Sequence, residues 1–471
     1  MTDDREQFDL VIVGMGSGGI VAAEFAATIG LRTAVVERGR FGGDCLWTGC
    51  VPSKALLAAA RAAHTMRHAD ALGLPAVTPD VDLGAVLKRV RAVQAEIAAT
   101  DDDPARFEAM GITVVAGTAR VTGPNEVTVN DERIIVARTV LLCTGSRPAV
   151  PAIDGLEEVG FLTSETLWNA DPPRSLVMIG GGPVVVELAQ ALARLGVTVT
   201  VLCGERSILP RDEPDLAAVL AGIIERDGVR LYTGAEVTSV ERVGDAVNVH
   251  ARVGDEFVVV KGDSVFVGVG RELNIDELDL GAAGIDVGPD GIVVDDRGRT
   301  TVRSVYVAGD LAGRHLFTHS AGHEAVRAVR DAFFPGAGKV PSLVPWCTFT
   351  DPELAHAGLT VAEAEERHGA DVDVWRLDLA RNDRARTDAT TTGAIVIVTA
   401  KSKVVGAHIL APAAGEMIHE LALAIQEGMT ISDLAGLVHV YPTLASGVGQ
   451  LAAEAAYEKA QKLRWLVRRG R

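Results

Sequence analysis

The sequence predicts an α/β fold with two βαβ units far apart in the chain and a separate α+β domain at the C-terminal end. Residues 9–19 and 176–183 each carry an apolar strand directly into a glycine cluster and then into a helical pattern. Each unit continues to a second apolar strand, Thr33–Glu37 in the first and Val197–Leu202 in the second. The C-terminal part mixes strand and helix patterns without such a cluster.

Composition limits the possible functions. A chain of 471 residues is too long for one hydrophobic core, so we expect several domains. A net charge of −18 argues against nucleic-acid binding, which needs a basic face. No apolar run approaches the ~18 residues of a membrane span, and the N-terminus lacks a basic-then-apolar signal. The five cysteines are scattered apart from one pair, so no structural disulfide framework is implied. We therefore expect a cytoplasmic protein that binds neither membrane nor nucleic acid.

The first glycine cluster has the spacing of a nucleotide-binding turn. Gly14 permits the turn, Gly16 lets the backbone approach a pyrophosphate, and Gly19 lets the helix pack close to the strand. The helix N-terminus favours the anionic phosphates. Glu37 ends the next strand, within reach of a ribose diol. We predict a first dinucleotide site here.

Cys45 and Cys50 lie five residues apart at a predicted helix start, where two thiols can approach closely enough to bridge if the helix is distorted. The N-terminus of a helix also lowers thiol pKa values and favours the reactive thiolate. A static disulfide is disfavoured in a cytoplasm. Half of a metal site is the other alternative, but no His/Cys cluster has zinc-ligand spacing. We predict a redox-active pair and no metal site.

The segments between and after these motifs predict further elements. Leu87–Ala99 is patterned as an amphipathic helix. Three β-branched runs suggest a small antiparallel meander: Thr113–Val115, Glu126–Val129 and Ile134–Val140. Another strand is expected at Ser304–Ala308. The C-terminal domain is expected to contain strands Thr348–Thr350, Ala394–Val398 and Val404–Ile409 and helices Ala414–Glu427 and Gly447–Gln461.

The second glycine cluster keeps Gly180 and Gly182 but has Val185 at the third position. We expect Val185 to widen the contact between helix and strand without blocking the pyrophosphate. An acid that would accept from the ribose of NADH is replaced by Cys203. Arg206 could meet the 2′-phosphate of NADPH, although an adjacent glutamate opposes that charge. The pattern favours NADPH over NADH.

The cysteine segment resembles the redox centre of the class I pyridine nucleotide-disulfide oxidoreductases, which include dihydrolipoamide dehydrogenase, glutathione reductase and mercuric reductase. The resemblance covers essentially the whole chain. Besides residues 42–54, the motifs that carry it lie at 143–148, 268–271, 307–310 and 349–353. It implies FAD and NAD(P)H as cofactors and a homodimer.

The resemblance also implies roles for individual residues. Cys50 would be the thiol under the flavin, and Cys45 the thiol that meets the substrate. Lys54 would lie near flavin N5 and pair with Glu187, since a buried unpaired charge is costly. Further cofactor contacts are implied for Gly43, Thr144, Gly145, Gly270 and, at the ribityl chain of FAD, Asp310.

One part of the family pattern is missing. Disulfide reductases of this family carry a histidine and a glutamate near the C-terminus, which shuttle a proton at the partner subunit's thiols. In that register this chain has Tyr441 and Ser446. Tyrosine is a poor base at neutral pH. His439 is two residues away, and we expect it to be structural.

Family architecture implies two Rossmann-like dinucleotide-binding domains and a C-terminal dimerisation domain: residues 1–150 and 271–340 for FAD, 151–270 for NAD(P) and 341–471 for the interface. The leading hypothesis is an oxidoreductase whose acceptor is a quinone, a metal ion or another non-disulfide oxidant. A second hypothesis is true disulfide reduction with Tyr441 or His439 as proton donor. A third is a non-catalytic flavoprotein scaffold, which the intact cysteine pair argues against.

Overall fold

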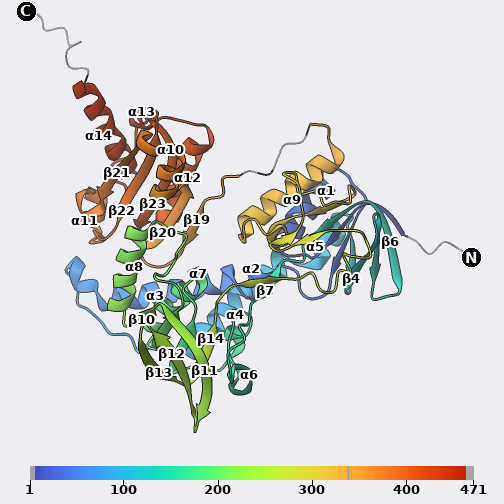
Figure 1. Cartoon of the computed structure of the whole chain (residues 1–471), viewed down its shortest axis with the longest axis horizontal. Helices are drawn as coiled ribbons and strands as arrows, with labels where there is room; N and C mark the ends of the chain where they lie inside the picture. Colours follow the sequence, from blue (N-terminus) through green and yellow to red (C-terminus); the bar gives the residue numbers. More distant parts are fainter. Residues whose placement is uncertain (1–5, 337–339, 341, 463–471) are drawn as a thin grey trace, which may run out of the picture.

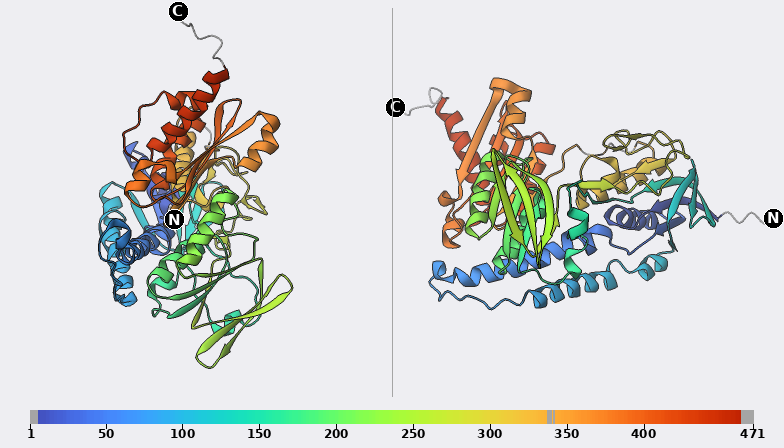
Figure 2. Two further views of the ribbon diagram at one scale, coloured as in Figure 1. Left: turned by 90° about the vertical axis from the view of Figure 1, so that its left-hand side faces the viewer. Right: turned by 60° about the horizontal axis from the view of Figure 1, so that its bottom comes forward.

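The computed structural model describes residues 6–336, 340 and 342–462. The described chain forms a mixed α/β structure with a sheet near the N-terminus, a second body in the middle of the sequence and a C-terminal domain (Figure 1). Figure 2 shows that long helices run beneath these bodies and connect them. None of the helices in the described part combines the length and apolar character that a membrane crossing requires.

The N-terminal sheet has seven strands, ordered β3-β2-β1-β6-β5-β4, with β18 also paired to β6. Its strands are β1 (Glu6–Val13), β2 (Thr33–Glu37), β3 (Thr113–Ala116), β4 (Ala119–Gly123), β5 (Glu126–Val129), β6 (Arg133–Leu142) and β18 (Val305–Val307). Helices α1 (Ser17–Thr28) and α9 (Thr318–Phe333) pack against each other. The strand expected at Ser304–Ala308 is confirmed as β18.

The expected meander needs a correction. The run at Thr113–Val115 is strand β3, which pairs in parallel with β2 and belongs to the nucleotide-binding half of the sheet. The other two runs, β5 and the first part of β6, do pair antiparallel as expected, and the second antiparallel partner of β5 is β4, at Ala119–Gly123. A short β-branched run fits either kind of pairing. Strand β4 gave little sequence signal, because Ala119 and Val121 are its only buried positions.

Helices link this sheet to the middle of the molecule. They are α2 (Gly43–Trp47), α3 (Cys50–Arg67), α4 (Leu83–Thr100), α5 (Pro104–Ala109) and α6 (Leu156–Val159). The helix predicted at Leu87–Ala99 is confirmed as part of α4. Helix α3 packs on α4 and on α7 (Pro183–Arg194), and its Leu56 and Leu57 join the same apolar core as Leu188 and Leu192. That packing places the start of α3 beside the second glycine cluster.

The middle body contains a parallel sheet ordered β10-β9-β8-β14 and an antiparallel sheet β11-β12-β13. The strands are β8 (Ser175–Ile179), β9 (Thr198–Cys203), β10 (Arg230–Thr233), β11 (Ala235–Val243), β12 (Ala246–Val253), β13 (Glu256–Gly262) and β14 (Ser264–Val267). Helix α8 (Pro214–Arg226) follows β9. Strand β15 (Arg271–Leu273) then pairs with β7 (Ser146–Pro148) and returns the chain to the first sheet; a small hairpin, β16 (Val287–Gly288) and β17 (Gly291–Ile292), follows.

The C-terminal domain is built on a five-stranded antiparallel sheet, ordered β19-β20-β23-β22-β21. Its elements are β19 (Trp346–Thr348), β20 (Glu353–Gly358), α10 (Val361–His368), β21 (Val372–Asp378), α11 (Asp383–Thr387), β22 (Ala394–Ala400), β23 (Lys403–Ala411), α12 (Ala414–Gln426), α13 (Ile431–Ala435) and α14 (Ser446–Lys462). The two predicted strands β22 and β23 and both predicted helices are confirmed.

The strand expected at Thr348–Thr350 is shifted. Strand β19 ends at Thr348, because the next backbone N–H, that of Phe349, donates to the carboxylate of Glu187 at 2.8 Å instead of to a strand. The ladder therefore stops where the chain meets helix α7.

Gly19→Ala is expected to lower the free energy of unfolding by about 1–3 kcal/mol, the usual range for overpacking. A Cβ atom at position 19 would clash with the backbone carbonyl of Gly14, so α1 would have to move away from β1. Urea denaturation measures the effect. Gly281→Ala is the matched control, since nothing lies within 4 Å of a Cβ there. Equal stability of the two variants would contradict the close-packing explanation.

Candidate active site

Both glycine clusters open into one cavity of about 1610 Å³. Its lining includes Gly14 and Gly16 from the first cluster, Gly180 and Gly182 from the second, and both thiols of the cysteine pair. A typical ligand pocket measures roughly 300–1,000 Å³, so this cavity exceeds what one small ligand needs. The fold therefore brings two dinucleotide-type turns and a dithiol to the same space.

The first cluster forms a close-packed cradle at the start of α1. Gly14 has φ +96°, a left-handed conformation that favours glycine. Gly16 and Gly43 face each other so closely that a Cβ on Gly43 would lie 2.7 Å from the Cα of Gly16. Glu37 lines the cavity and is oriented by two backbone N–H donors, Met15 at 2.6 Å and Gly39 at 2.7 Å. Its carboxylate keeps further lone pairs for a hydroxyl donor.

A polar network surrounds Asp310, which lines the cavity together with Thr144, Gly145 and Gly270. Ser146 donates a hydrogen bond to Asp310, and Arg271 Nε donates to Ser146 Oγ at 2.6 Å. Arg271 also pairs with Asp44 at 3.1 Å, beside Cys45. Burial raises the pKa of Asp310. Sequence reasoning did not assign Ser146, Arg271 or Asp44, although all three lie inside or next to the quoted motifs.

The two thiols are free and half-buried, with Cys45 on α2 and Cys50 as the first residue of α3. A hydrogen bond from Cys45 lowers the pKa of Cys50 to about 6, and Thr318 and the charge of Lys54 act in the same direction. The Thr318 hydroxyl lies 3.3 Å from Cys50 Sγ. The pKa of Cys45 is raised, first by its hydrogen bond with Cys50 and then by burial. At neutral pH the reduced pair therefore holds a Cys50 thiolate and a Cys45 thiol.

Lys54 forms an ion pair with Glu187, with 2.9 Å between Nζ and Oε2. Glu187 is buried at 5% exposure, and its other oxygen accepts the Phe349 N–H. The Phe349 ring centroid lies 4.3 Å from Lys54 Nζ, a cation–π contact. Residues from α3, α7 and the start of the C-terminal domain thus meet at one charge, which lies on the cavity wall.

At the second cluster, Val185 packs against the residue that follows strand β14. Its side chain is fully buried, and a Cβ on Gly268 would lie only 2.5 Å from one of its methyl groups. Glycine at 268 therefore makes room for valine at 185. A widened contact between helix and strand stays a prediction. Gly182, by contrast, has nothing within 4 Å of a Cβ position. Space beside Gly182 is left open toward the cavity that it lines.

Of the residues that could distinguish NADH from NADPH, some line the cavity and others do not. Arg206 is exposed and is not among the described residues that line the cavity, whereas Glu205, Glu236 and Arg211 line it. Cys203 is buried, and its thiol donates weakly to the Glu205 and Ser207 carbonyls at 3.6 and 3.5 Å.

The C-terminal candidates lie away from the thiols of their own chain. The Tyr441 hydroxyl donates to Asp383 at 2.9 Å, and its side chain is exposed. Ser446 Oγ donates to the Thr443 carbonyl at 2.6 Å. His439 Nε2 lies 3.0 Å from a carboxylate oxygen of Glu420. None of these three candidates lines the cavity formed by the described residues. Within the same part of the chain, no group of three or more His, Cys, Asp or Glu side chains is arranged to hold a metal ion.

Comparison with known proteins identifies the family. The pattern described as "Pyridine nucleotide-disulphide oxidoreductase" matches residues 8–332, and that of its dimerisation domain matches residues 344–452. This chain belongs to the pyridine nucleotide-disulphide oxidoreductases. The family uses FAD and NAD(P)H.

Curated relatives and solved structures agree. A mercuric reductase of Bacillus cereus is 33% identical over 94% of this chain and 70% of its own length. A dihydrolipoyl dehydrogenase of Bacillus subtilis is 34% identical over 95% of both chains. The HOCl-induced flavoprotein disulfide reductase of Escherichia coli is 26% identical with a TM-score of 0.84, covering 94% of this chain and 99% of the other. Its Cu(II) complex gives a TM-score of 0.85, at 26% identity over 95% and 99%.

The cradle fits the FAD of this oxidoreductase family. The N-terminus of α1, bordered by the facing glycines 16 and 43, leaves no side chain between backbone N–H groups and an anion. Glu37 and Asp310 are the acidic groups that would accept from the ribose and ribityl hydroxyls. Gly180 and Gly182 offer the same kind of helix start, α7, for NAD(P)H.

Titration of the reduced pair is expected to separate the contributions to the Cys50 pKa. In the wild type, the thiolate–flavin absorbance of the reduced holoenzyme should rise with pH through a midpoint near 6. Cys45→Ala removes the hydrogen bond that lowers this pKa most, so the midpoint should move up. Cys45→Ser, which keeps a donor, should stay closer to the wild type. The measurement is anaerobic absorbance against pH, and equal midpoints for Ala and Ser would contradict the hydrogen-bond explanation.

Proposed function

We propose that this chain is an FAD-dependent NAD(P)H oxidoreductase that delivers electrons through the Cys45–Cys50 pair to a quinone, a metal ion or another non-disulfide oxidant. Bound FAD would accept hydride from NAD(P)H and reduce the disulfide. The observation that carries the choice of acceptor is the pair Tyr441 and Ser446, which offers no imidazole and no carboxylate. A thiol leaving group needs such a proton shuttle, whereas reduction of a metal ion takes up no proton and a reduced quinone can take its two protons from water.

The local contacts of Tyr441 support this proposal. Its hydroxyl already donates to Asp383, and that hydrogen bond raises the tyrosine pKa. A phenol with a raised pKa is an even poorer base at neutral pH. His439 is engaged as well, with Nε2 at Glu420 and Nδ1 3.3 Å from the Leu437 carbonyl. These contacts favour a structural role for His439.

The thiols themselves suit soft acceptors. Cys50 as a thiolate and Cys45 as a thiol give two sulfur groups, and thiolates prefer soft metal ions. Without a third ligand among the described residues, a metal ion at this pair would be held loosely, as a substrate and not as a resident cofactor. A structural neighbour, the Escherichia coli reductase, has been solved as a Cu(II) complex.

The assembly and the location remain proposals too. The match to the dimerisation domain supports a homodimer, in which residues 439–446 would face the partner subunit's thiols. Val438 is 92% exposed and Val440 is 78% exposed, as expected for apolar side chains that a second subunit covers. The domain boundaries at 150, 270 and 340 and a cytoplasmic location stay predictions.

A panel of acceptors tests the main proposal. With NAD(P)H as donor, turnover with quinones or Cu(II) should exceed turnover with lipoamide or glutathione disulfide. Tyr441→Phe should leave quinone turnover within about twofold, because exposed contacts of this kind contribute little. Comparable efficiency with a disulfide, lost in Tyr441→Phe or His439→Ala, would favour the disulfide-reductase alternative. Failure of NAD(P)H to bleach the flavin would revive the scaffold alternative.

The double variant Tyr441→His/Ser446→Glu offers a gain-of-function arm. Restoring an imidazole and its orienting carboxylate should raise disulfide turnover while quinone turnover stays near wild type. The single variant Tyr441→His is the control, since its imidazole lacks the carboxylate. A double variant with no more disulfide activity than the wild type would argue that the missing dyad does not limit the acceptor.

Cofactor preference follows from the charges on the cavity wall. We propose NADH in place of the NADPH favoured by the sequence pattern, because the two carboxylates of Glu205 and Glu236 outweigh the single charge of Arg211 on the same cavity wall and would repel a 2′-phosphate. The measurement is kcat/KM for both donors. Arg206→Gln should change the ratio little, while Glu205→Gln should improve NADPH relative to NADH. A large loss of NADPH activity in Arg206→Gln would restore the original expectation.

A further inference from the structure

Three polar side chains share one face of helix α7. Glu187, Gln190 and Arg194 follow the spacing that places helical residues in one row. All three are buried, with exposures of 5%, 1% and 5%. Burying a guanidinium is costly unless it is paired and fully hydrogen-bonded. We therefore expect these three side chains to bind specific partners on neighbouring segments.

The first two members of the row hold the chain where it enters the C-terminal domain. Glu187 accepts the Phe349 N–H at 2.8 Å. Gln190 accepts the Asp351 N–H at 2.8 Å and donates to the Asp351 carbonyl at 2.8 Å. These side chains take over the backbone partners that β19 loses beyond Thr348. Residues 349–351 are thus held by α7 and not by the sheet.

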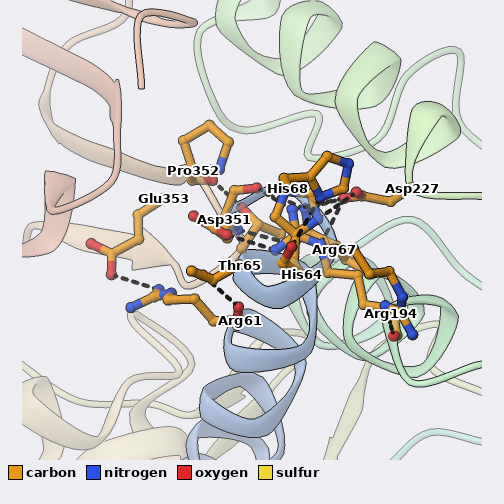
Figure 3. Close-up of polar contacts among 12 residues, drawn as sticks. Arg61, His64, Thr65, Arg67, His68, Arg194, Asp227, Asp351, Pro352 and Glu353 are labelled. Atoms are coloured by element: carbon orange, nitrogen blue, oxygen red, sulfur yellow. Dashed lines mark hydrogen bonds and ion pairs between the residues drawn. The ribbon is translucent and has the colours of Figure 1, made fainter. Parts of the chain in front are cut away.

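Arg194, the last member of the row, binds two carboxylates. Its Nη1 donates to Asp351 Oδ2 at 2.6 Å and its Nε to Asp227 Oδ2 at 3.0 Å, while Nη2 reaches the Asp351 carbonyl at 3.1 Å. Gln190 also donates to Asp227 at 2.8 Å. Figure 3 shows Arg194, Asp227 and Asp351 converging beside α3. We call Gln190, Arg194, Asp227 and Asp351 the α7 node.

Helix α3, which carries Cys50 and Lys54, is tied to the same node. Arg67 Nη1 donates to the Arg194 carbonyl at 2.5 Å, and His64 Nδ1 lies 3.5 Å from Asp227. A more exposed pair, Arg61 with Glu353 at 3.6 Å, lies at its edge (Figure 3). Three segments that are far apart in sequence are therefore fixed relative to each other around one buried guanidinium.

We propose that Arg194 and Gln190 are positioning residues that hold Lys54 between Glu187 and the Phe349 ring. The inference rests on the proposed electron path, in which Lys54 acts beside the flavin. Loosening the node would let residues 349–351 and the α3 helix shift against α7. Glu187 would then lose its Phe349 partner, and the Lys54 charge would no longer be fixed next to Cys50. Small misplacements at a reacting centre can cost on the order of a hundredfold in rate.

The effect of an Arg194 substitution, measured with and without Lys54, distinguishes a positioning role from a role in stability alone. If Arg194 acts through Lys54, removing Lys54 first should make the node irrelevant to the chemistry, because coupled residues are non-additive. A purely structural Arg194 would lower stability and rate by the same factor whether or not Lys54 is present. Arg61→Gln is the matched control, since it removes an arginine of α3 that pairs with the C-terminal domain outside the node.

The experiment uses holoenzyme of wild type, Arg194→Gln, Gln190→Ala, Arg61→Gln and Lys54→Met, and of the double variant Arg194→Gln/Lys54→Met. Flavin reduction by NAD(P)H is followed anaerobically, and the thiolate–flavin absorbance is titrated with pH after chemical reduction. We expect Arg194→Gln and Gln190→Ala to slow flavin reduction on the order of tenfold. Both should raise the thiolate midpoint. Arg61→Gln should stay within about twofold of the wild type.

In the Lys54→Met background, Arg194→Gln should add no further change to either readout. An equal slowing with and without Lys54, or an unchanged thiolate midpoint, would overturn the proposal. If Arg194→Gln does not fold, Gln190→Ala, which leaves the Arg194 pairs in place, carries the same comparison. Because the thiolate midpoint is read after chemical reduction, it tests the node even if NAD(P)H fails to reduce the wild-type flavin, the result that would instead sink the proposed function.

Discussion

The ion pair between Lys54 and Glu187 is the contact around which the described structure is arranged. A lysine at the start of α3 becomes useful beside a dithiol only if its charge stays in a fixed place, and the buried carboxylate of Glu187 is costly without such a cation. Glu187 supplies the partner from α7, and Phe349 covers the ammonium from the C-terminal domain. The pair therefore requires the packing of α3 on α7 and the end of strand β19 at Thr348. The position of the Lys54 charge therefore depends on the packing of three separate segments.

The cysteine pair shows how similar groups are made different by position. Cys50 begins a helix and receives hydrogen bonds from Cys45 and Thr318, while Cys45 carries the proton. The asymmetry arises from geometry and not from residue type. It gives one sulfur that holds negative charge, the reactive thiolate form, and one that keeps its proton. The choice of electron acceptor then depends on residues outside this pair, namely on which side chains can take up or supply the proton.

Much of the fold was predictable, because glycine spacing and apolar strands encode local geometry directly. The site residues around Gly14 and Cys50 came from such patterns, and the Lys54–Glu187 contact came from a family resemblance. The α7 node was not predictable, because Gln190 and Asp351 are 161 positions apart and no local pattern links them. Strand β4 was not predicted for a different reason, since two buried side chains are too few to show the alternation of a strand. The role of Arg206 stays a prediction, because it is exposed and is not among the described residues that line the cavity.

The fit of Val185 against Gly268 limits which side chains this corner of the fold can accept. A Cβ atom at position 268 would lie 2.5 Å from a methyl group of Val185 and 3.1 Å from the Phe266 ring. Shortening Val185 alone would therefore not free position 268 for a larger residue, because the Phe266 ring still lies against it. Packing on two sides thus requires glycine at 268, on the wall of the cavity itself.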